Sequence, residues 1–328
     1  MGKLHLSVAV GDYDRTRPLI DGDVAIDGVE GIYMRLHPEE IFFRAFRHQE
    51  FHICELSLSS FTVRTARGDN PYIGVPVFPS RAFRHTSITV RKDRGINTPA
   101  DLAGRRIGVP EYQLTANVWA RAILAEHGLS PESVEWVRGG LEEPGRTEKI
   151  ALSLPPSIRL SDIPAEATLS SMLAKGEIDG IIAPRIPSCF DGGRTVGWLF
   201  DDPRAAAMDW YRRSGIFPIM HVLGIRRDLV DDHPWLPAAV QKAFVAAKRM
   251  ALERLSDTSA TKVTLPFVED QLQDAIALLG PDYWSYGFAE NRHVLDAFLD
   301  HHHSQGLSPR RVQVEELFHP AAMETARI

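Results

Sequence analysis

The sequence predicts an α/β fold that is large enough for two domains and ends in a helical tail. Three observations support this prediction. Short apolar runs alternate with segments whose apolar residues recur at helical spacing, a pattern typical of a mainly parallel sheet covered by helices. The chain has 328 residues, whereas single hydrophobic cores stop growing at about 250–300 residues. After about Asp228 only long helical patterns follow.

The individual elements can be read in order along the chain. Eight strands are expected, at residues 4–10, 31–36, 51–56, 88–92, 105–110, 134–139, 178–184 and 221–227. Helices are expected between them at 38–48, 115–128 and 167–176, and in the tail at 236–255, 268–280 and 292–306. Several of these helical patterns run into a glycine, which often ends a helix. Amphipathic tail helices cannot bury their own faces, so the tail must pack on the first domain.

Composition and charge exclude several classes of protein. The formal net charge is -6, which argues against a general binder of nucleic acid or of acidic membranes. The amino terminus lacks the long apolar region of a signal peptide, and no run of about 18 apolar residues follows. We therefore expect a cytoplasmic protein. The two cysteines, Cys54 and Cys189, are far apart and suggest neither a disulfide framework nor a zinc site.

One stretch combines apolar ends with a cationic centre. Residues 77–90 read VFPSRAFRHTSITV, so Arg81, Arg84 and His85 interrupt an otherwise buried strand pattern. Buried positive charges need a negative partner. We expect that partner to be a bound anion.

The loops that follow the predicted strands carry a specific resemblance. They read GDYDRTRPL, ELSLSSF, FPSRAFRHTS, PEYQLTANVW, GGLEEPGR, APRIPS and SGIFPIMH. Together with PWLPAAVQKAF, YWSYGFAENR and EELFHP near the end, they closely resemble the bacterial 4,5-dihydroxyphthalate decarboxylase family, almost from end to end.

The resemblance implies a type II periplasmic-binding-protein-like fold, in which two α/β lobes enclose a ligand cleft and two strands cross between them. INTPADLAGRRIGVP is similar to the segment that opens the second lobe in such proteins, and GEIDGIIAP to a step near its end. Lobe one would comprise residues 1–90 and 223–328, with the tail, and lobe two residues 91–222. The crossings would lie near 86–90 and 220–225.

The resemblance also implies the reaction. The substrate would be 4,5-dihydroxyphthalate and the products protocatechuate and carbon dioxide, formed without a cofactor. Such chemistry requires a cationic anchor for the retained carboxylate and an acid that protonates the ring carbon.

Arginines and helix starts are the candidate anchors, because the planar guanidinium and free backbone N–H groups both bind carboxylates. Each arginine could instead make an ordinary ion pair, and each helix start could simply be capped. The candidate substrate-binding residues are Asp14, Arg15, Ser57, Ser59, Arg81, Arg84, Tyr112, Thr115, Arg146 and Arg185.

Three residues are the leading candidates for proton transfer. His85 and His221 would stand on the two crossings and border one cleft, and histidine titrates near neutrality. Glu111 would act as an acid or orient the substrate, or merely lie in the first turn of a helix. Asp12, Asp14 and Glu55 are further acid or base candidates, and Tyr13 is one candidate for an aromatic wall.

Three alternatives stay open at this point. Asp12, Asp14 and His85 could bind a divalent metal, although no dense ligand motif supports this. The chain could be a non-catalytic binding protein for an aromatic or dicarboxylic acid, since fold alone does not decide function. It could also act on another aromatic acid. The expected partner is a small aromatic carboxylate, with neither nucleic acid nor membrane, and a homo-oligomer is left open.

Overall fold

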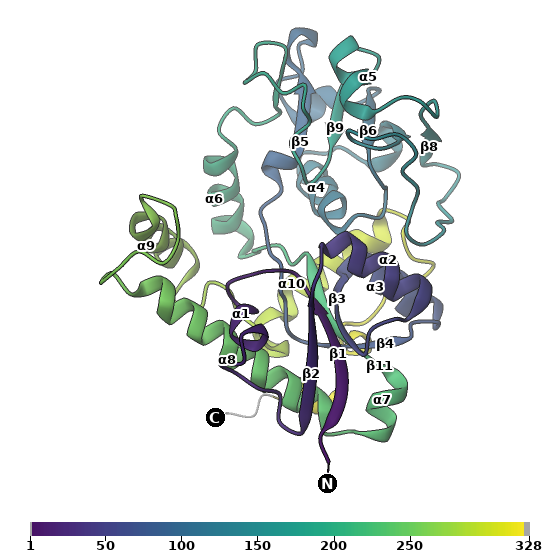
Figure 1. The fold of residues 1–328 in the computed structure, drawn as a ribbon. Helices are drawn as coiled ribbons and strands as arrows, with labels where there is room; N and C mark the ends of the chain where they lie inside the picture. The colour runs from purple at the N-terminus through teal and green to yellow at the C-terminus, as the bar shows by residue number, and fades with distance from the viewer. Residues whose placement is uncertain (1, 325–328) are drawn as a thin grey trace.

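A computed structural model describes residues 2–324 of the chain. It contains two β-sheets, one in each of two bodies, and Figure 1 shows one body above the other. The amino terminus lies at the far end of the lower body, and the helical C-terminal segments surround that body.

The lower body is built on a five-stranded sheet in the order β2-β1-β3-β11-β4. Its strands are β1 (Leu4–Val10), β2 (Val29–Arg35), β3 (Ile53–Ser57), β4 (Tyr72–Val75) and β11 (His221–Arg226). Strand β1 runs parallel to β2 and β3, whereas β11 is antiparallel to both β3 and β4.

The upper body is built on a six-stranded sheet in the order β10-β5-β9-β6-β7-β8. Its strands are β5 (Ile88–Arg91), β6 (Arg106–Val109), β7 (Glu135–Arg138), β8 (Arg159–Asp162), β9 (Gly180–Ile182) and β10 (Val196–Trp198). Strand β5 is antiparallel to its neighbours β9 and β10, and the other pairs are parallel.

The α-helices of the described chain fall between these strands and in the tail. They are α1 (Arg17–Ile20), α2 (Pro38–His48), α3 (Leu58–Arg67), α4 (Thr115–Ala125), α5 (Leu169–Lys175), α6 (Pro203–Ser214), α7 (Arg227–Asp232), α8 (Leu236–Ser256), α9 (Val268–Leu279), α10 (Phe288–Ser304) and α11 (Pro320–Met323). Short 3-10 turns are η1 (His85–Ser87), η2 (Lys92–Arg94), η3 (Pro99–Leu102), η4 (Pro131–Ser133) and η5 (Val314–Leu317).

The predicted α/β pattern is confirmed. All eight expected strands are present, and α2 spans the expected residues 38–48. Three strands were not predicted. Strand β8 is mostly exposed and so lacks apolar alternation, while β4 and β10 have only four and three residues.

The two sheets are joined through residues 76–87 and 215–220. Strand β5 lies wholly in the upper sheet and β11 wholly in the lower one, so neither strand crosses between the bodies as expected. The linking segments before them pair with each other through an antiparallel bridge between Arg81 and Ile219. We propose that the lobes divide within these two segments, slightly earlier in the chain than residues 90 and 222.

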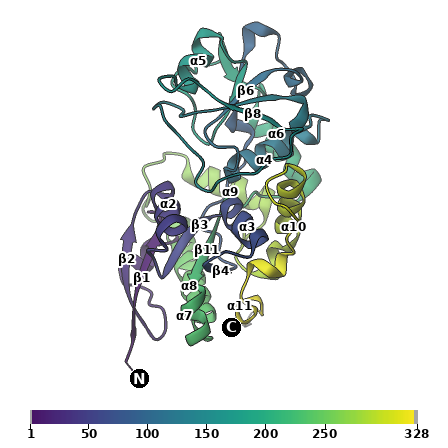
Figure 2. The ribbon, with the colours of Figure 1, turned by 90° about the vertical axis from the view of Figure 1, so that its right-hand side faces the viewer.

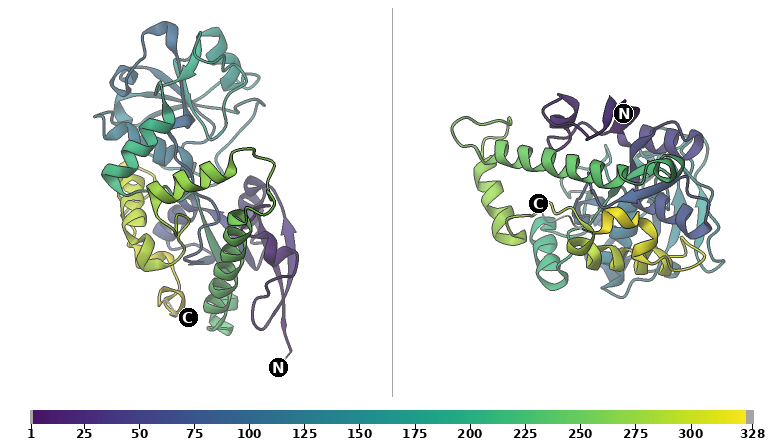
Figure 3. Two further views of the ribbon diagram at one scale, coloured as in Figure 1. Left: turned by 90° about the vertical axis from the view of Figure 1, so that its left-hand side faces the viewer. Right: turned by 90° about the horizontal axis from the view of Figure 1, so that it is seen from below.

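The tail contacts both bodies. Helix α8 runs along the lower body, and α9 turns back from its end (Figure 3), where Asp274 of α9 pairs with Arg204 of α6 in the upper body. Helix α10 lies beside α3 and α4 (Figure 2). At the end of α10, Gln305 accepts a hydrogen bond from Arg121 of α4 at 2.7 Å. The tail therefore braces the two lobes against each other.

Two buried histidines make the fold sensitive to acid. Burial, together with the nearby His127 and Arg213, lowers the pKa of His85 to about 4. Burial also lowers the pKa of His302 to about 3, although a hydrogen bond with Ser59 opposes this. An unfolded histidine titrates near 6.5, so the unfolded state binds more protons between pH 6.5 and about 4. Stability therefore falls as the pH falls through this window.

We expect the free energy of unfolding to drop by about 2 kcal/mol per buried histidine between pH 7.5 and pH 5. Urea unfolding at both pH values measures this drop. A His85→Phe variant should lose about 2 kcal/mol less than the wild type, whereas His5→Gln, at an exposed site, should behave as the wild type does. If the free energy of unfolding drops equally in the wild type and in His85→Phe, protonation of His85 does not cause the acid sensitivity.

Candidate active site

Three helices begin around one small cavity between the two lobes. The cavity has a volume of about 180 Å³. It is lined by the first residues of α2, α3 and α4 and by Arg84, Arg185 and His221; the lining residues at the helix starts are His37, Pro38, Glu39, Ser57, Leu114, Thr115 and Ala116. The first backbone N–H groups of a helix have no partner within the helix. Three such ends directed at one cavity favour a bound anion.

Arg84 lines this cavity and forms no ion pair with a carboxylate of the described residues. Its Nε donates to Sδ of Met220 at 3.0 Å, a weak acceptor. Burial lowers its pKa to about 10, and no carboxylate of the described residues acts against this. Arginine at this pKa is charged at neutral pH. A buried guanidinium without a protein counter-ion is suited to a carboxylate ligand.

His221 lines the same cavity and is held from behind. Its Nδ1 lies 2.5 Å from Oε1 of Glu55, and its ring stacks edge-on against Phe42 with the centroids 4.8 Å apart. Glu55 is fully buried and also accepts hydrogen bonds from the Tyr13 hydroxyl and the Gly11 N–H, each at 2.9 Å. Because Nδ1 faces Glu55, Nε2 is the ring nitrogen available to a ligand.

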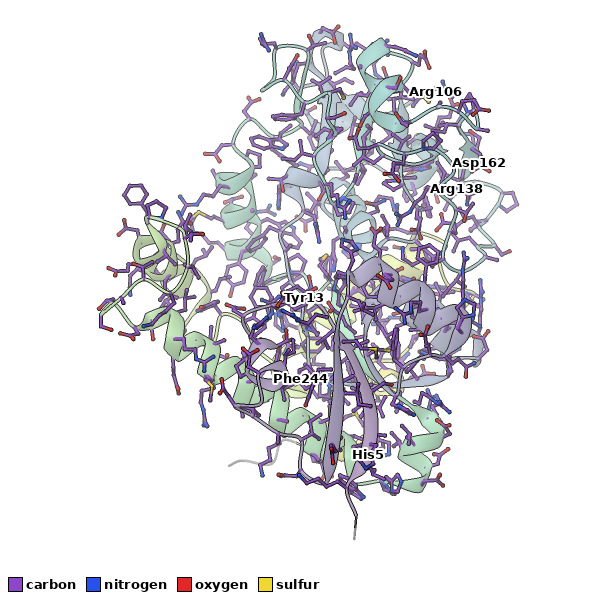
Figure 4. All side chains as sticks on the ribbon, viewed as in Figure 1. His5, Tyr13, Arg106, Arg138, Asp162 and Phe244 are labelled. Carbon is purple, nitrogen blue, oxygen red and sulfur yellow. The ribbon has the colours of Figure 1, made fainter. Side chains whose placement is uncertain are left out.

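The electrostatics of this cluster favour a charged Glu55. Burial alone would raise the pKa of Glu55, but His221 and the hydrogen bonds from Gly11 and Tyr13 lower it below its usual value. Burial and the neighbouring Glu55 raise the pKa of Tyr13, which keeps the phenol protonated. Tyr13 lies just beyond the end of β1 that faces the upper lobe, whereas His5 lies at the opposite end (Figure 4).

Two hydroxyl groups meet across the cleft beside Arg84. The Ser57 and Thr115 hydroxyl oxygens are 3.0 Å apart, and Thr115 Oγ1 accepts a hydrogen bond from the Ser59 N–H at 3.0 Å. Thr115 of the upper lobe thus caps α3 of the lower lobe. Ser59 itself is buried, and its hydroxyl bonds with His302 at 3.1 Å, so only Ser57 and Thr115 of these predicted ligands line the cavity.

A larger compartment of about 430 Å³ adjoins the cavity and shares Glu39, Leu114, Pro184 and Arg185 with it. Arg146 lines this compartment and bridges the lobes, because it binds Glu39 at 2.7 Å and Glu111 at 2.5 Å. Arg185 contacts Nε2 of His37 at 2.8 Å across the same boundary. A ligand could extend from one compartment into the other.

Glu111 is the centre of a buried ion-pair network. Its Oε1 accepts from Arg146 and from Nζ of Lys149 at 2.6 Å, and its Oε2 accepts from the Lys149 N–H at 3.1 Å. Both Glu111 and the Lys149 side chain are almost completely buried. Glu111 does not line the cavity that holds His221. The structure therefore supports a structural role for this candidate acid.

Arg81, Arg15 and Asp14 are not brought to the cavity. Arg81 donates to the carbonyl oxygens of Phe217 at 2.9 Å and Ser285 at 2.8 Å and to the side chain of Asn291, so it ties the two linking segments and the tail together. Arg15 stacks on Tyr13 and donates to the carbonyl of Pro79 at 2.6 Å. Asp14 accepts from Arg15 at 3.1 Å.

His85 and Tyr112 also lie elsewhere. His85 packs against Phe200 and Trp210 and lines a separate cavity of about 280 Å³ between α6 and α9. Tyr112 is fully buried, where it stacks with Arg121 and donates to the Gln305 carbonyl at 3.3 Å. The expectation that both crossing histidines share one cleft fails because η1 turns His85 toward α6.

Comparison with known proteins places the chain in a family. A family model described as "NMT1/THI5 like" matches residues 82–144. A protein of Comamonas testosteroni named 4,5-dihydroxyphthalate decarboxylase is 62% identical over 330 residues, which cover 100% of both chains. The chain belongs to the 4,5-dihydroxyphthalate decarboxylase family. A second family member, from Pseudomonas putida, is 63% identical over 214 residues, which cover 65% of this chain and 83% of that protein.

Solved structures confirm the two-lobed fold of this decarboxylase family member. The alkanesulfonate-binding protein SsuA of Xanthomonas axonopodis pv. citri aligns with a TM-score of 0.52 at 12% identity, covering 97% of this chain and 99% of that one. The periplasmic aliphatic sulphonate binding protein SsuA of Escherichia coli aligns with a TM-score of 0.50 at 13% identity, covering 96% and 91%. The likeness shows a type II periplasmic-binding-protein-like fold.

Sequence reasoning missed two contributors to the site of this decarboxylase family member. Lys149 lies in a region without periodic pattern, so nothing in the sequence placed it beside Glu111. His37 precedes Pro38, and a residue before a proline at a helix start is a recognisable N-cap position. That signal could have placed the start of α2, although not its approach to Arg185.

The described residues of this decarboxylase family member contain neither a metal-binding cluster nor a membrane-spanning helix. Within residues 2–324, no group of three or more His, Cys, Asp or Glu side chains is placed to hold a metal ion. Asp12 instead pairs with Arg17 and Arg35. No helix in the same residues is long and apolar enough to cross a membrane.

Proposed function

We propose that this chain is a carboxy-lyase that converts 4,5-dihydroxyphthalate to protocatechuate (3,4-dihydroxybenzoate) and carbon dioxide in the cavity lined by Arg84 and His221. The single observation that carries this placement is the juxtaposition of three helix starts, a histidine backed by Glu55 and an arginine that has no acidic partner among the described residues. The relatives named for this reaction support the choice of substrate.

The anchoring groups match the charges of this substrate. Its two adjacent carboxylates carry two negative charges, and the cavity offers the guanidinium groups of Arg84 and Arg185 together with helix N–H groups. Charge-assisted hydrogen bonds to a planar guanidinium are among the strongest in proteins. The adjoining compartment gives room for the remainder of the ring, and the two cavities together suit a ligand of this size.

The reaction requires one proton at one ring carbon. The hydroxyl para to the leaving carboxylate donates electron density, so the ring carbon that bears this carboxylate can accept a proton. The bond to the carboxylate then breaks, its electron pair restores the aromatic ring, and carbon dioxide leaves. The dianionic substrate and one proton thus give one monoanionic product and one carbon dioxide.

His221 is the group best placed to deliver this proton. Its Nε2 is directed away from Glu55, and the ring lines the anion cavity. His221 donates the proton through Nε2 while Nδ1 stays bonded to Glu55, and Nε2 later regains a proton from solvent. General acid catalysis by a positioned side chain typically contributes about 10²–10⁴-fold in rate.

The enzyme acts without a cofactor, in the cytoplasm, and its partner is a small aromatic carboxylate. A non-catalytic binding protein would need the same anchors but neither Glu55 nor a proton donor. The fully buried carboxylate behind His221 is therefore the feature that favours catalysis over binding alone.

Purified protein mixed with 4,5-dihydroxyphthalate tests the proposal. Chromatography should show protocatechuate formed in step with substrate loss and with released carbon dioxide, and chelator treatment should leave the rate unchanged. A ligand that binds but stays intact, both with and without added divalent metal, would favour the binding protein. Turnover of a different aromatic acid in a small panel would point to another substrate within the family.

Replacement of Arg84 tests the anchor. An Arg84→Met variant keeps much of the side-chain volume but removes the charge, and loss of a charged hydrogen bond costs about 1.5–3 kcal/mol. We expect the Kd for substrate, measured by calorimetry, to rise about 10- to 100-fold. Arg204→Met is the matched control, because Arg204 is an exposed arginine of the upper lobe. If both variants bind the substrate with the same affinity, Arg84 is not part of the binding site.

A further inference from the structure

Strand pairing in the lower sheet fixes the position of the Glu55 carboxylate next to His221. Strands β3 and β11 are antiparallel, with His221 opposite Ser57 and Leu223 opposite Glu55. Glu55 and Ser57 are two residues apart on one strand, so their side chains share a face of the sheet. Glu55 and His221 are thus diagonal neighbours on this face. The backbone pairing fixes their approach.

Three groups of the described chain hydrogen-bond to the Glu55 carboxylate, and of these three His221 is the one that lines the cavity. Tyr13 and the Gly11 N–H come from the loop after β1, and His221 comes from β11. Arg15 lies over the Tyr13 ring, 4.3 Å from its centroid, and makes no ion pair with Glu55 in the described chain. An ionised carboxylate only accepts hydrogen bonds, so His221 must donate from Nδ1.

We propose that Glu55 is a positioning residue that keeps the Nδ1 proton on His221 and thereby directs Nε2 of that ring at the substrate. This inference rests on the proposed function, because it assigns Glu55 a part in the same proton transfer. Glu55 itself does not touch the substrate. Tyr13 and the Gly11 N–H hold the carboxylate in the orientation that His221 requires.

The Gly11 N–H determines how the side-chain amide is oriented in a Glu55→Gln variant. This donor faces Oε2 of Glu55, so the amide oxygen of a glutamine must take that place. The amide NH₂ then takes the place of Oε1, beside His221 Nδ1 and the Tyr13 hydroxyl. An NH₂ group donates, so Nδ1 must become the acceptor and the imidazole proton must move to Nε2. The variant should therefore invert the tautomer of His221.

Nitrogen-15 NMR of histidine-labelled full-length protein without substrate tests this directly. The resonances of His221 are assigned by their absence from His221→Gln. In the neutral ring of the wild type we expect the proton on Nδ1, and in Glu55→Gln we expect it on Nε2. Tyr13→Phe leaves the carboxylate in place, so it should keep the Nδ1 proton. A wild-type ring protonated on Nε2, or an unchanged tautomer in Glu55→Gln, would overturn the inference.

Kinetics give the second readout. In Glu55→Gln, Nδ1 accepts from the glutamine amide, so loss of the Nε2 proton would leave an unfavourable imidazolate. We therefore expect kcat to fall by about 100-fold or more while KM changes less than about threefold. Tyr13→Phe should lose only a few-fold in kcat. An inverted tautomer with wild-type kcat would also overturn the inference. If the wild type shows the Nδ1 proton but no turnover, the proposed function fails and the positioning of His221 by Glu55 stands.

Discussion

A His221→Gln variant is expected to bind 4,5-dihydroxyphthalate with a Kd close to that of the wild type and to turn it over about 10²–10⁴ times more slowly. Glutamine retains a polar side chain of similar reach, so the anchors at Arg84 and the helix starts stay in place. It cannot deliver a proton to a ring carbon. Calorimetry for binding and chromatography for product separate the two effects.

His85→Gln is the matched comparison for this experiment. The sequence predicts a catalytic role for both histidines, whereas the structure places His85 in a separate cavity between α6 and α9. We expect the His85 variant to keep kcat within a few-fold of the wild type. A large loss in the His85 variant with normal turnover in the His221 variant would reverse the assignment. Loss of binding and turnover together in His221→Gln would mean that His221 anchors the substrate.

Glu111→Gln is expected to destabilise the protein by about 3–5 kcal/mol. Breaking a buried ion pair by removing one partner leaves an uncompensated buried charge. Lys149 would be left in that state, because its side chain is 1% exposed and its Nζ binds Glu111. Arg146 retains Glu39. The free energy of unfolding by urea is the measurement.

Two further variants show whether this effect comes from the ion pair. Glu111→Gln combined with Lys149→Met removes both charges, so the double variant should recover much of the loss. Glu50→Gln breaks a pair with Arg44 at an exposed site and should have no measurable effect. If Glu111→Gln abolishes turnover while the stability and the Kd stay normal, Glu111 is an acid in the reaction, as the sequence also allowed.

The fold could be predicted largely because its signals are local or repeated. Helix α2 has its apolar residues at helical spacing, charged ends and Pro38 in its first turn. Strands β1 and β3 are dense in apolar residues. The strand pattern of VFPSRAFRHTSITV continues into β5, which lies in the upper sheet. We therefore propose a lobe boundary slightly earlier in the chain than the sequence predicts.

The sequence predicted which types of residue form the site, but not which of the individual candidate residues reach it. The cavity brings together Arg84, Arg185, His221, Ser57 and Thr115, as expected. Each lies at the end of a strand, at a helix start or in a connecting segment at the edge between the lobes. Arg81 belongs to the same cationic stretch, three positions before Arg84, but its side chain is directed at the tail. Its oxygen partners at Phe217, Ser285 and Asn291 lie more than 130 residues away. No local pattern encodes such contacts.

A crystal structure of the inactive His221→Gln variant with 4,5-dihydroxyphthalate tests the central claim most directly. We expect the substrate in the cavity between the lobes, with one carboxylate bound to the Arg84 guanidinium and with residue 221 beside the ring carbon that bears the other. The helix starts at Ser57 and Thr115 should contact the bound carboxylate. A substrate bound next to His85 between α6 and α9, or bound in the cleft without contact to Arg84, would contradict it.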